Sequence, residues 1–284
     1  MPPPTPKTIT SAQFSDVLAR YPRLVNVIST SKALKPGHKS LEELDLFRYI
    51  EAPKNFGLGN ATRSAMDREA IKLLVEWKLR HGKFRPTLMS LVSNNPADLV
   101  ANTIRQAIDT YTESGAAPAL EILKRLKGIG PATASLLLSV HDVDKVPFFS
   151  DEAYHWLCCN GRKESIQYKA QEYDELAQEA VALMQRLDVG ALDIERVAYV
   201  LMKENAESST TKALAKKTTA LKNGRKAPSE KKNTPQSKEK DAPAGLMDSA
   251  GPEARMKATK RYAEPADETA ATAQPLRRSK RNKP

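Results

Sequence analysis

The sequence has 284 residues, 28% of them charged, and a formal net charge of +11, so it is long enough for one large domain or two small ones. It holds no run of about 18 apolar residues and starts with MPPPTPKTIT, so we expect neither a membrane-spanning nor a secreted protein. Its two cysteines, Cys158 and Cys159, are too few for a four-cysteine metal site and are typical of reduced thiols in an intracellular protein.

Charge and composition change near residue 205. Residues 206–284 carry 19 Lys and Arg against 9 Asp and Glu and hold one aromatic residue, Tyr262, whereas residues 1–205 have a net charge of only +1. A segment with so little apolar surface cannot bury a core. We therefore expect a disordered leader over residues 1–9, one folded domain over residues 10–205 and a disordered basic tail over residues 206–284.

The predicted tail is the main source of positive charge, and basic residues favour nucleic acid as a partner because they neutralise phosphates. Its clusters, such as RRSKR at Arg277–Arg281, also indicate import into the nucleus. We expect a nuclear protein whose tail contacts DNA, chromatin or repair proteins. The alternative is a solvated tail that only increases solubility.

The first part of the expected domain shows apolar residues at helical spacing. Residues 11–28 form an amphipathic pattern that Pro22 splits into two short predicted helices. Residues 40–52 begin with the capping-box pair Ser40 and Glu43 and end before Pro53, and a loop with glycines follows at 54–60. The pattern thus predicts helices from the start of the domain.

The same pattern continues to residue 204. Ser64 and Asp67 give a second capping signature before a helix over 68–81, and Asn95 with Pro96 predicts the cap and first turn of another over 97–111. Further helices are predicted over 87–92, 119–126, 132–141, 151–159, 173–187 and 192–204. No convincing alternation of period two occurs, so the predicted fold class is all-α, with about ten helices.

Two glycines, Gly128 and Gly130, stand one residue apart between two of these helices. Glycine lets backbone amides come within hydrogen-bonding distance of a ligand, and the start of the next helix adds the positive end of its dipole. We therefore predict a phosphate site formed by the amides of Gly128, Gly130, Ala132 and Thr133. The alternative is that the glycines only end one helix before the next begins.

The motif LKGIGPATA at 126–134 is followed, twenty-one residues after Gly130, by Asp151 in VPFFSDEAYHW. This pairing resembles the helix-hairpin-helix DNA glycosylase superfamily, the endonuclease III-like base-excision enzymes, and the preceding FFS is similar to 3-methyladenine glycosylases. The resemblance follows the helical order of residues 40–205 but is motif-specific only over about 122–156. It implies two helical lobes with the active site between them, and a helix-hairpin-helix at about 118–141 that grips double-stranded DNA.

The resemblance also implies roles for single residues. Asp151 would be the catalytic carboxylate, which stabilises positive charge on the deoxyribose or orients the attacking water. The carbonyl oxygens of Lys127 and Ile129 would hold a monovalent cation, and no other cofactor is implied. The alternative for Asp151 is that it only caps the next helix together with Ser150.

The sequence departs from the family at two points. Bifunctional members carry a lysine two residues after the second hairpin glycine, where this chain has Ala132, so no Schiff base can form at that position. The four-cysteine iron–sulfur loop of some members is also missing. The resemblance therefore implies a monofunctional glycosylase that repairs DNA without lyase chemistry.

Five further residues are candidates for pocket or DNA contacts: Trp77, Lys83, Arg85, Tyr154 and His155. Aromatic rings stack on cationic alkylated bases, and basic residues can clamp a DNA strand. His155 stands four residues after Asp151, which places both on one helix face. The alternatives are core packing for the aromatics and a complement to a helix dipole for the basic residues. For the whole chain, the alternatives are a catalytically inactive DNA-binding module and a chromatin-associated interaction protein.

Overall fold

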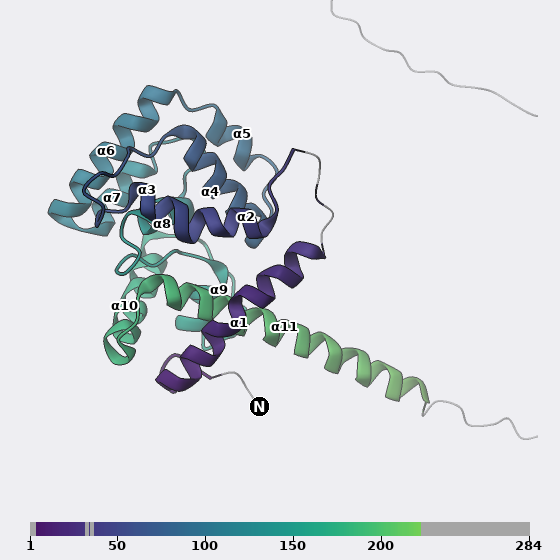
Figure 1. Cartoon of the computed structure of the whole chain (residues 1–284). Helices are drawn as coiled ribbons and strands as arrows, with labels where there is room; N and C mark the ends of the chain where they lie inside the picture. Colours follow the sequence, from purple (N-terminus) through teal and green to yellow (C-terminus); the bar gives the residue numbers. More distant parts are fainter. Residues whose placement is uncertain (1–3, 32–33, 35–36, 223–284) are drawn as a thin grey trace, which may run out of the picture. The chain divides into compact units, whose positions relative to one another are not determined.

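The computed structural model describes residues 4–31, 34 and 37–222, with side chains described as far as residue 206 (Figure 1). Within these residues every regular element is a helix, which confirms the all-α prediction. The described residues all belong to one compact unit. None of the described helices combines the length and the apolar character needed to cross a membrane.

The two ends of the expected domain have different outcomes. Helix α11, Ala191–Lys222, continues through the expected boundary at residue 205, and residues 223–284 lie outside the described residues, so the disordered tail stays a prediction. The expectation of a disordered leader over residues 1–9 is wrong for residues 4–9, because Arg186 donates to the carbonyl oxygens of Pro6 (2.6 Å) and Ile9 (2.8 Å). Ile9 is also fully buried, so this part of the leader packs on the domain.

Helix α1, Ser11–Thr30, is one helix, although its Pro22 predicted two. A proline inside a helix costs about 3 kcal/mol because it cannot donate a hydrogen bond and crowds the preceding turn. The buried face of α1 offsets this cost, since Phe14, Val17, Tyr21 and Val25 lie on both sides of Pro22 along the helix. Tertiary packing therefore overrides the local signal.

Helix α2, Leu41–Leu46, begins with the predicted capping box of Ser40 and Glu43. The helical segment that starts with α2 does not end before Pro53 as predicted. It continues through a π-helical turn, η1 at Phe47–Glu51, into α3, Ala52–Phe56. Backbone bonds in a π turn reach the fifth residue, and this wider turn accommodates Pro53, which has no N–H to donate. The predicted loop over 54–60 therefore begins later, at Gly57.

The remaining helices follow the predicted order. Helices α4, α6 and α9 begin at the predicted residues, whereas α5, α7, α8 and α10 begin one to three residues away. Their bounds are α4 Arg68–His81, α5 Leu88–Ser93, α6 Ala97–Ser114, α7 Ala116–Leu123, α8 Pro131–His141, α9 Asp151–Leu157 and α10 Ala170–Leu187. In α4 the cap is Asp67, which accepts from the Ala70 N–H at 2.8 Å, and not Ser64. The apolar residues that stand at helical spacing in the sequence of α4, Ile71, Leu74, Val75 and Leu79, form one stripe, and all four are buried.

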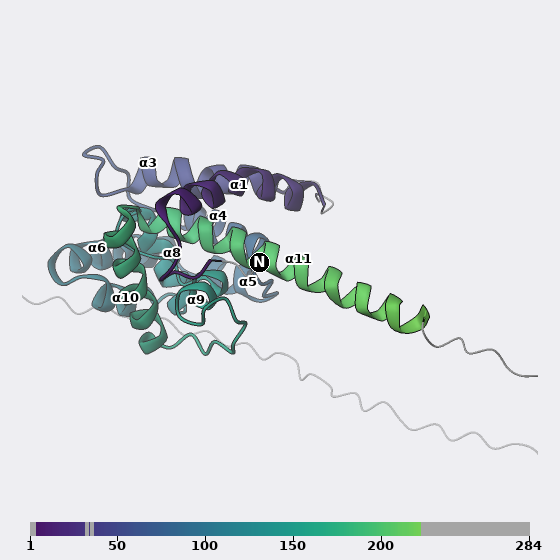
Figure 2. The same ribbon diagram turned by 90° about the horizontal axis from the view of Figure 1, so that it is seen from below.

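The helices form two contact groups (Figure 1, Figure 2). Helices α2 to α8 pack on one another, whereas α9 and α10 pack on α11 together with α1, which lies against α11 in both views. Helix α1 also contacts α2. The first and last helices of the described chain are thus neighbours, and the middle helices form the other group.

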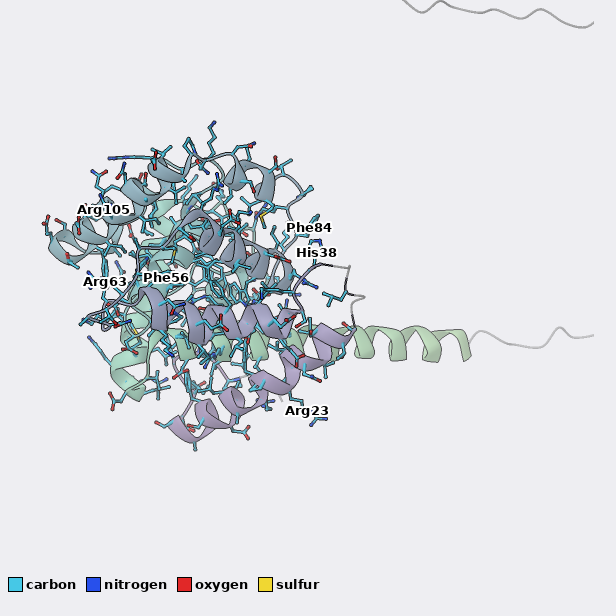
Figure 3. The ribbon with its side chains drawn as sticks, turned by 45° about the horizontal axis from the view of Figure 1, so that its top comes forward. Arg23, His38, Phe56, Arg63, Phe84 and Arg105 are labelled. Atoms are coloured by element: carbon cyan, nitrogen blue, oxygen red, sulfur yellow. The ribbon has the colours of Figure 1, made fainter. Side chains whose placement is uncertain are left out.

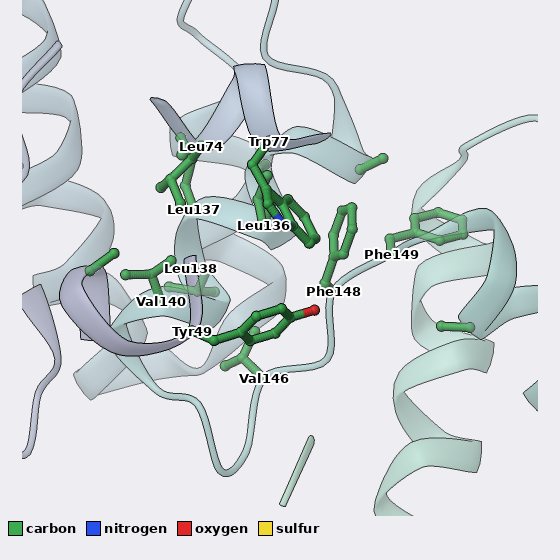
Figure 4. Close-up of a cluster of buried hydrophobic side chains, with 14 of the residues drawn as sticks. Tyr49, Leu74, Trp77, Leu136, Leu137, Leu138, Val140, Val146, Phe148 and Phe149 are labelled. Atoms are coloured by element: carbon green, nitrogen blue, oxygen red, sulfur yellow. The ribbon is translucent and has the colours of Figure 1, made fainter. Parts of the chain in front are cut away.

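A buried apolar cluster lies around α8 (Figure 4). Leu136, Leu137 and Leu138 are fully buried, and the ring of Phe148 lies 5.8 Å from that of Trp77. A buried ion pair crosses the same region: Arg48 donates to Glu195 at 3.1 Å and to the Ser139 hydroxyl at 2.7 Å. These bonds join η1, α8 and α11, and so hold the two groups of helices together.

Candidate functional site

A turn over residues 124–130, which we call the glycine turn, joins α7 to α8. Gly128 has a φ of +79°, and a Cβ there would lie 2.9 Å from the Cβ of Leu91 on α5, so glycine is required twice over. Gly130 is different: it caps α8 with extended backbone, and a Cβ there would meet no atom within 4 Å. Ile129, between them, is buried.

The four backbone N–H groups of the predicted phosphate site lie in the glycine turn and in the first turn of α8, and they differ in their hydrogen bonds. Those of Gly128, Gly130 and Ala132 make no hydrogen bond to any described residue. The Thr133 N–H, by contrast, donates to the Gly130 carbonyl at 2.9 Å, so it is not a free donor. Three free donors at the start of an eleven-residue helix are suited to an anion, because the helix dipole also favours negative charge there.

A buried asparagine holds the glycine turn in place. Asn95, which is 2% exposed, accepts from the Lys127 N–H at 2.8 Å and donates to the Lys127 carbonyl at 3.0 Å. It also donates to the carbonyl of Val92 on α5 at 3.0 Å. The sequence predicted Asn95 as a helix cap, but the cap of α6 is Pro96, and the side chain of Asn95 forms a tertiary bridge instead.

The hydrogen bond from Asn95 to the Lys127 carbonyl also involves one of the two oxygens of the predicted cation site. The Lys127 carbonyl oxygen already accepts the hydrogen bond from Asn95, whereas the Ile129 carbonyl oxygen accepts none from the described residues. Each carbonyl oxygen has two lone pairs, so both oxygens keep the capacity to face a cation. The cation at Lys127 and Ile129 stays a prediction.

Asp151 lies in a small pocket, the Asp151 pocket, between the end of α4 and the start of α9. The pocket has a volume of about 20 Å³, which is room for about one water molecule. It is lined by Trp77, Lys78, His81, Gly82, Lys83, Arg85, Phe148, Ser150, Asp151, Glu152 and Tyr168. Helices from both contact groups therefore contribute to it.

The local sequence turns the Asp151 side chain into this pocket. Ser150 is the cap of α9, and its hydroxyl accepts from the Ala153 N–H at 3.0 Å. Asp151 is therefore not needed as a cap, and its carboxylate instead accepts a hydrogen bond of 2.5 Å from the Tyr168 hydroxyl. Burial and this hydrogen bond raise the pKa of Tyr168, so the phenol keeps its proton and remains the donor.

Lys78 on α4 shares the pocket with Asp151. Burial, the largest cause, and the nearby Arg85 lower the pKa of Lys78 to about 8 from the ordinary 10.5, and Asp151 and Glu152 only partly oppose this. Its ammonium lies 5.5 Å from the ring centre of Phe148, and it makes no ion pair or hydrogen bond with a described residue.

Sequence analysis did not select Lys78 as a site residue, although a signal was present. Lys78 stands seven residues after Ile71 and three after Val75, so the helical spacing of α4 predicts a hydrophobic residue at its position. A lysine at a core-facing position is uncommon unless it has a function or a partner. Tyr168 was also missed, because its approach to Asp151 depends on the fold of the chain between α9 and α10.

The other predicted contacts separate into two groups. Lys83 and Arg85 line the pocket, and the guanidinium of Arg85 lies 5.4 Å from the ring centre of Tyr168. Trp77 also borders the pocket but is fully buried and donates to Asp45 at 3.0 Å, so it belongs to the core. Phe84, between the two basic residues, is 70% exposed (Figure 3).

Tyr154 and His155 lie away from the Asp151 pocket. The hydroxyl of Tyr154 donates to Glu175 on α10 at 3.0 Å. The His155 ring contacts the Glu164 carbonyl at 2.9 Å, and neither residue lines the pocket. The expected face shared by His155 and Asp151 therefore does not bring them into one site, because the short helix α9 uses His155 to hold the following loop.

The Asp151 pocket and the glycine turn are joined by two elements. Ser135 on α8 accepts from the Phe149 N–H at 2.9 Å, and it stands one helical turn, about 6 Å along the axis, after Pro131. On the other side, the chain passes from Arg85 at the pocket directly into α5, whose Leu88 borders Gly128. The glycine turn and the Asp151 pocket are therefore connected through α8 and through the link into α5.

No protein-family model, curated protein or solved structure matches this chain. We therefore infer its function from the geometry of the Asp151 pocket and the glycine turn, together with the motifs of the sequence.

Proposed function

We propose that this chain is a nuclear base-excision protein with a helix-hairpin-helix glycosylase fold, a DNA glycosylase that hydrolyses the N-glycosidic bond of a damaged base. The observation that carries the proposal is the placement of Asp151, a carboxylate in a pocket beside α9. The segment just before α9 is hydrogen-bonded to α8 one turn after the glycine turn. Breaking this bond builds positive charge on the deoxyribose, and a carboxylate at the sugar stabilises that charge.

The glycine turn supplies the second part of the proposal, the hold on DNA. The free amides of Gly128, Gly130 and Ala132 would bind a backbone phosphate, while a monovalent cation at the carbonyls of Lys127 and Ile129 would add positive charge. Lys83 and Arg85 would contact the strand that enters the pocket. The basic residues of 206–284 would add affinity for DNA or chromatin and direct the protein to the nucleus.

The phosphate site is tested by Gly130→Asp. The backbone suits any residue and the new side chain meets open space, so the free energy of unfolding will change by only a few tenths of a kcal/mol. The new carboxylate will repel the phosphate and take up the amides itself. Losing two charge-assisted hydrogen bonds, about 1.5 kcal/mol each, weakens duplex binding roughly 100-fold.

The matched control is Gly59→Asp, the same change of charge at a glycine that also faces open space and lies away from the turn. Fluorescence anisotropy with a labelled duplex at fixed salt gives the affinity of each full-length variant. Unchanged binding by Gly130→Asp, or an equal loss in both variants, would mean that the glycine turn does not hold DNA.

The chemical step is tested by Asp151→Asn, with Asp142→Asn as the same change at a half-buried aspartate outside the pocket. The full chain is incubated with duplexes that carry alkylated, deaminated, oxidised or mismatched bases, and free base is measured. We expect Asp151→Asn to retain DNA binding and to lower base release at least about 100-fold. If the unchanged chain releases no base from any duplex, it is not a glycosylase.

One observation favours a second function, a DNA-binding module without catalysis. The hydroxyl of Tyr168 already occupies the Asp151 carboxylate, and the pocket has room for about one water molecule. A sugar reaches the carboxylate only after Tyr168 moves away. Binding that depends on Gly130 without any base release would establish this second function.

A further inference from the structure

A second pocket, which we call the His141 pocket, is lined by residues of α3, of the link after it, of α6 and of the end of α8. Its volume is about 380 Å³, and sites for small molecules measure about 300–1,000 Å³. It shares no lining residue with the Asp151 pocket and does not include the glycine turn. The proposed function therefore leaves this pocket without a role.

Backbone hydrogen bonds hold the link, residues 57–67, that forms one wall of the His141 pocket. The Leu58 N–H donates to the carbonyl oxygen of His141 at 2.8 Å. The Ser64 N–H donates to the carbonyl oxygen of Asn55 on α3, also at 2.8 Å. The link is thus fixed to α8 and to α3, so the wall is formed before any ligand binds and little ordering opposes binding.

The buried part of the His141 pocket, which we call its floor, combines apolar side chains with one imidazole. Four buried apolar residues line it: Phe56, Met66, Ile104 and Ile108. His141 is only 5% exposed, and its Nδ1 lies 2.8 Å from the carbonyl oxygen of Phe56. Its Nε2 makes no hydrogen bond with a described residue. A buried polar atom without a partner is costly, so a ligand that pairs with Nε2 gains free energy.

The ring of His141 is neutral at pH 7. Burial, the largest cause, and the charge of Arg63 lower its pKa from 6.5 to about 4, although the hydrogen bond to Phe56 opposes this change. The Phe56 carbonyl oxygen can only accept, so the single ring proton is on Nδ1 and Nε2 keeps a lone pair. Nε2 is therefore an acceptor that requires a donor from the ligand.

The rim of the His141 pocket is charged. Arg63 in the link and Arg105 on α6 both line the pocket and are exposed (Figure 3). Arg63 makes no ion pair or hydrogen bond with a described residue, and Arg105 has one long hydrogen bond, 3.4 Å, to Asn102. Guanidinium groups match the oxygens of a phosphate in pairs. Asp109 lies four residues after Arg105 on the same face of α6 and adds an acceptor to the rim.

We propose that the His141 pocket binds a nucleoside 5′-monophosphate. The base lies on the apolar floor and donates an N–H to Nε2 of His141, because every nucleobase has a flat face and at least one such donor. The phosphate pairs with Arg63 and Arg105, and Asp109 accepts from the sugar hydroxyls. Inorganic phosphate uses only the rim and an apolar molecule uses only the floor, whereas a mononucleotide uses both. This site is independent of DNA binding at the glycine turn.

The test is isothermal titration calorimetry of the full chain with the 5′-monophosphates of adenosine, guanosine, cytidine and uridine. Inorganic phosphate and the four nucleosides are titrated in parallel. We expect at least one monophosphate to bind at least about ten times more tightly than either of its parts, since only the whole ligand contacts floor and rim. Nitrogen NMR should also show that the Nε2 signal of His141 shifts on binding, because this atom accepts a new hydrogen bond.

The contribution of the rim is tested by Arg63→Gln. The side chain is exposed and has no ion pair with a described residue, so the variant should fold as the unchanged chain does. Loss of one charge-assisted contact should weaken nucleotide binding roughly 10-fold. The matched control is Arg23→Gln, the same change at an exposed arginine on α1 outside the pocket, which should not alter binding (Figure 3).

Four results would overturn the proposal. They are no binding of any monophosphate at about 1 mM, binding no tighter than that of inorganic phosphate, an equal loss in Arg23→Gln, and an Nε2 signal of His141 that does not move when nucleotide binds. A labelled DNA duplex is the last comparison. If Arg63→Gln weakens duplex binding and leaves nucleotide binding unchanged, the rim contacts the DNA backbone and the pocket is not a nucleotide site.

Discussion

Replacing Lys78 by methionine will stabilise the fold at neutral pH. The pKa of Lys78 falls from 10.5 to about 8 on folding, chiefly because the ammonium is buried. Each unit corresponds to about 1.4 kcal/mol, so holding the charged amine in the pocket costs up to about 3 kcal/mol. Methionine has a similar length and no charge, and its side chain can pack against Phe148.

The sign of the pH dependence follows from proton binding. The unfolded chain binds the Lys78 proton more tightly than the folded chain does, so the cost is complete below pH 8 and decreases as pH rises towards 10.5. The stability gap between Lys78→Met and the unchanged chain should therefore be largest at pH 7 and should narrow between pH 8 and pH 10. Comparing the two chains at each pH cancels the contributions of other titrating groups.

Urea unfolding followed by circular dichroism measures this gap at each pH, with Lys72→Met as the control. Lys72 is paired with Glu69 at the surface, so its replacement should change the free energy of unfolding by no more than about 0.5 kcal/mol at any pH. A gap that stays constant from pH 7 to pH 10, or a Lys78→Met variant less stable than the unchanged chain, would refute the argument. In either case the amine of Lys78 would not be a strained, desolvated cation.

Three further results are expected. Gly128→Ala should destabilise the fold by about 2–4 kcal/mol through its positive φ and a contact at 2.9 Å, whereas Gly130→Ala should cost less than about 1 kcal/mol, both measured by urea unfolding. Arg48→Met should cost about 3–5 kcal/mol and lower the melting temperature, because it leaves a buried carboxylate without its partner. Tyr168→Phe should speed the modification of Lys78 by an amine reagent, measured by mass spectrometry, because the Tyr168 hydroxyl closes the pocket through its bond to Asp151. Tyr154→Phe should not, because the Tyr154 hydroxyl bonds to Glu175 outside the pocket.

The helical class was predictable because it depends on local signals that packing reinforces. The stripe of α4, the capping box at Ser40 and the proline at the start of α8 all lie where their spacing indicates. Pro22 and Pro53 gave wrong helix ends, since the cost of a proline is smaller than the gain from a buried face or is absorbed by a π turn. In this chain, a proline therefore predicts the end of a helix less reliably than apolar spacing predicts the helix itself.

The candidate site was predictable only in part, because some of its residues act through partners that are distant along the chain. The spacing between Gly130 and Asp151 pointed to both residues, and the structure joins the elements that carry them through Ser135. Tyr168 and Asn95 could not be assigned from the sequence, because their roles depend on partners distant along the chain. A polar side chain that completes a tertiary contact leaves no periodic pattern.

The walls of the Asp151 pocket differ in how firmly they are held. The α4 wall is supported by Trp77, which is fully buried, donates to Asp45 and stacks on His81 at 4.4 Å. The α9 wall is anchored by the bond from the Phe149 N–H to α8. Both walls therefore belong to the core, and neither can move without breaking buried contacts.

The third wall, Tyr168, is held mainly by contacts within the pocket. Its backbone has a φ of +57°, a left-handed conformation that is costly for a bulky residue, and its hydroxyl bonds to Asp151. Moving Tyr168 outward would relieve this strain, but it would break the hydrogen bond to Asp151 and the contacts with the Arg85 guanidinium and the Phe149 ring, whose centre lies 5.5 Å from that of Tyr168. If the proposed function holds, a sugar–phosphate strand would offer Arg85 a phosphate and Asp151 a positively charged sugar, and these contacts would compensate for those that Tyr168 loses. DNA bound in this way would supply free energy for the displacement of Tyr168 from the pocket.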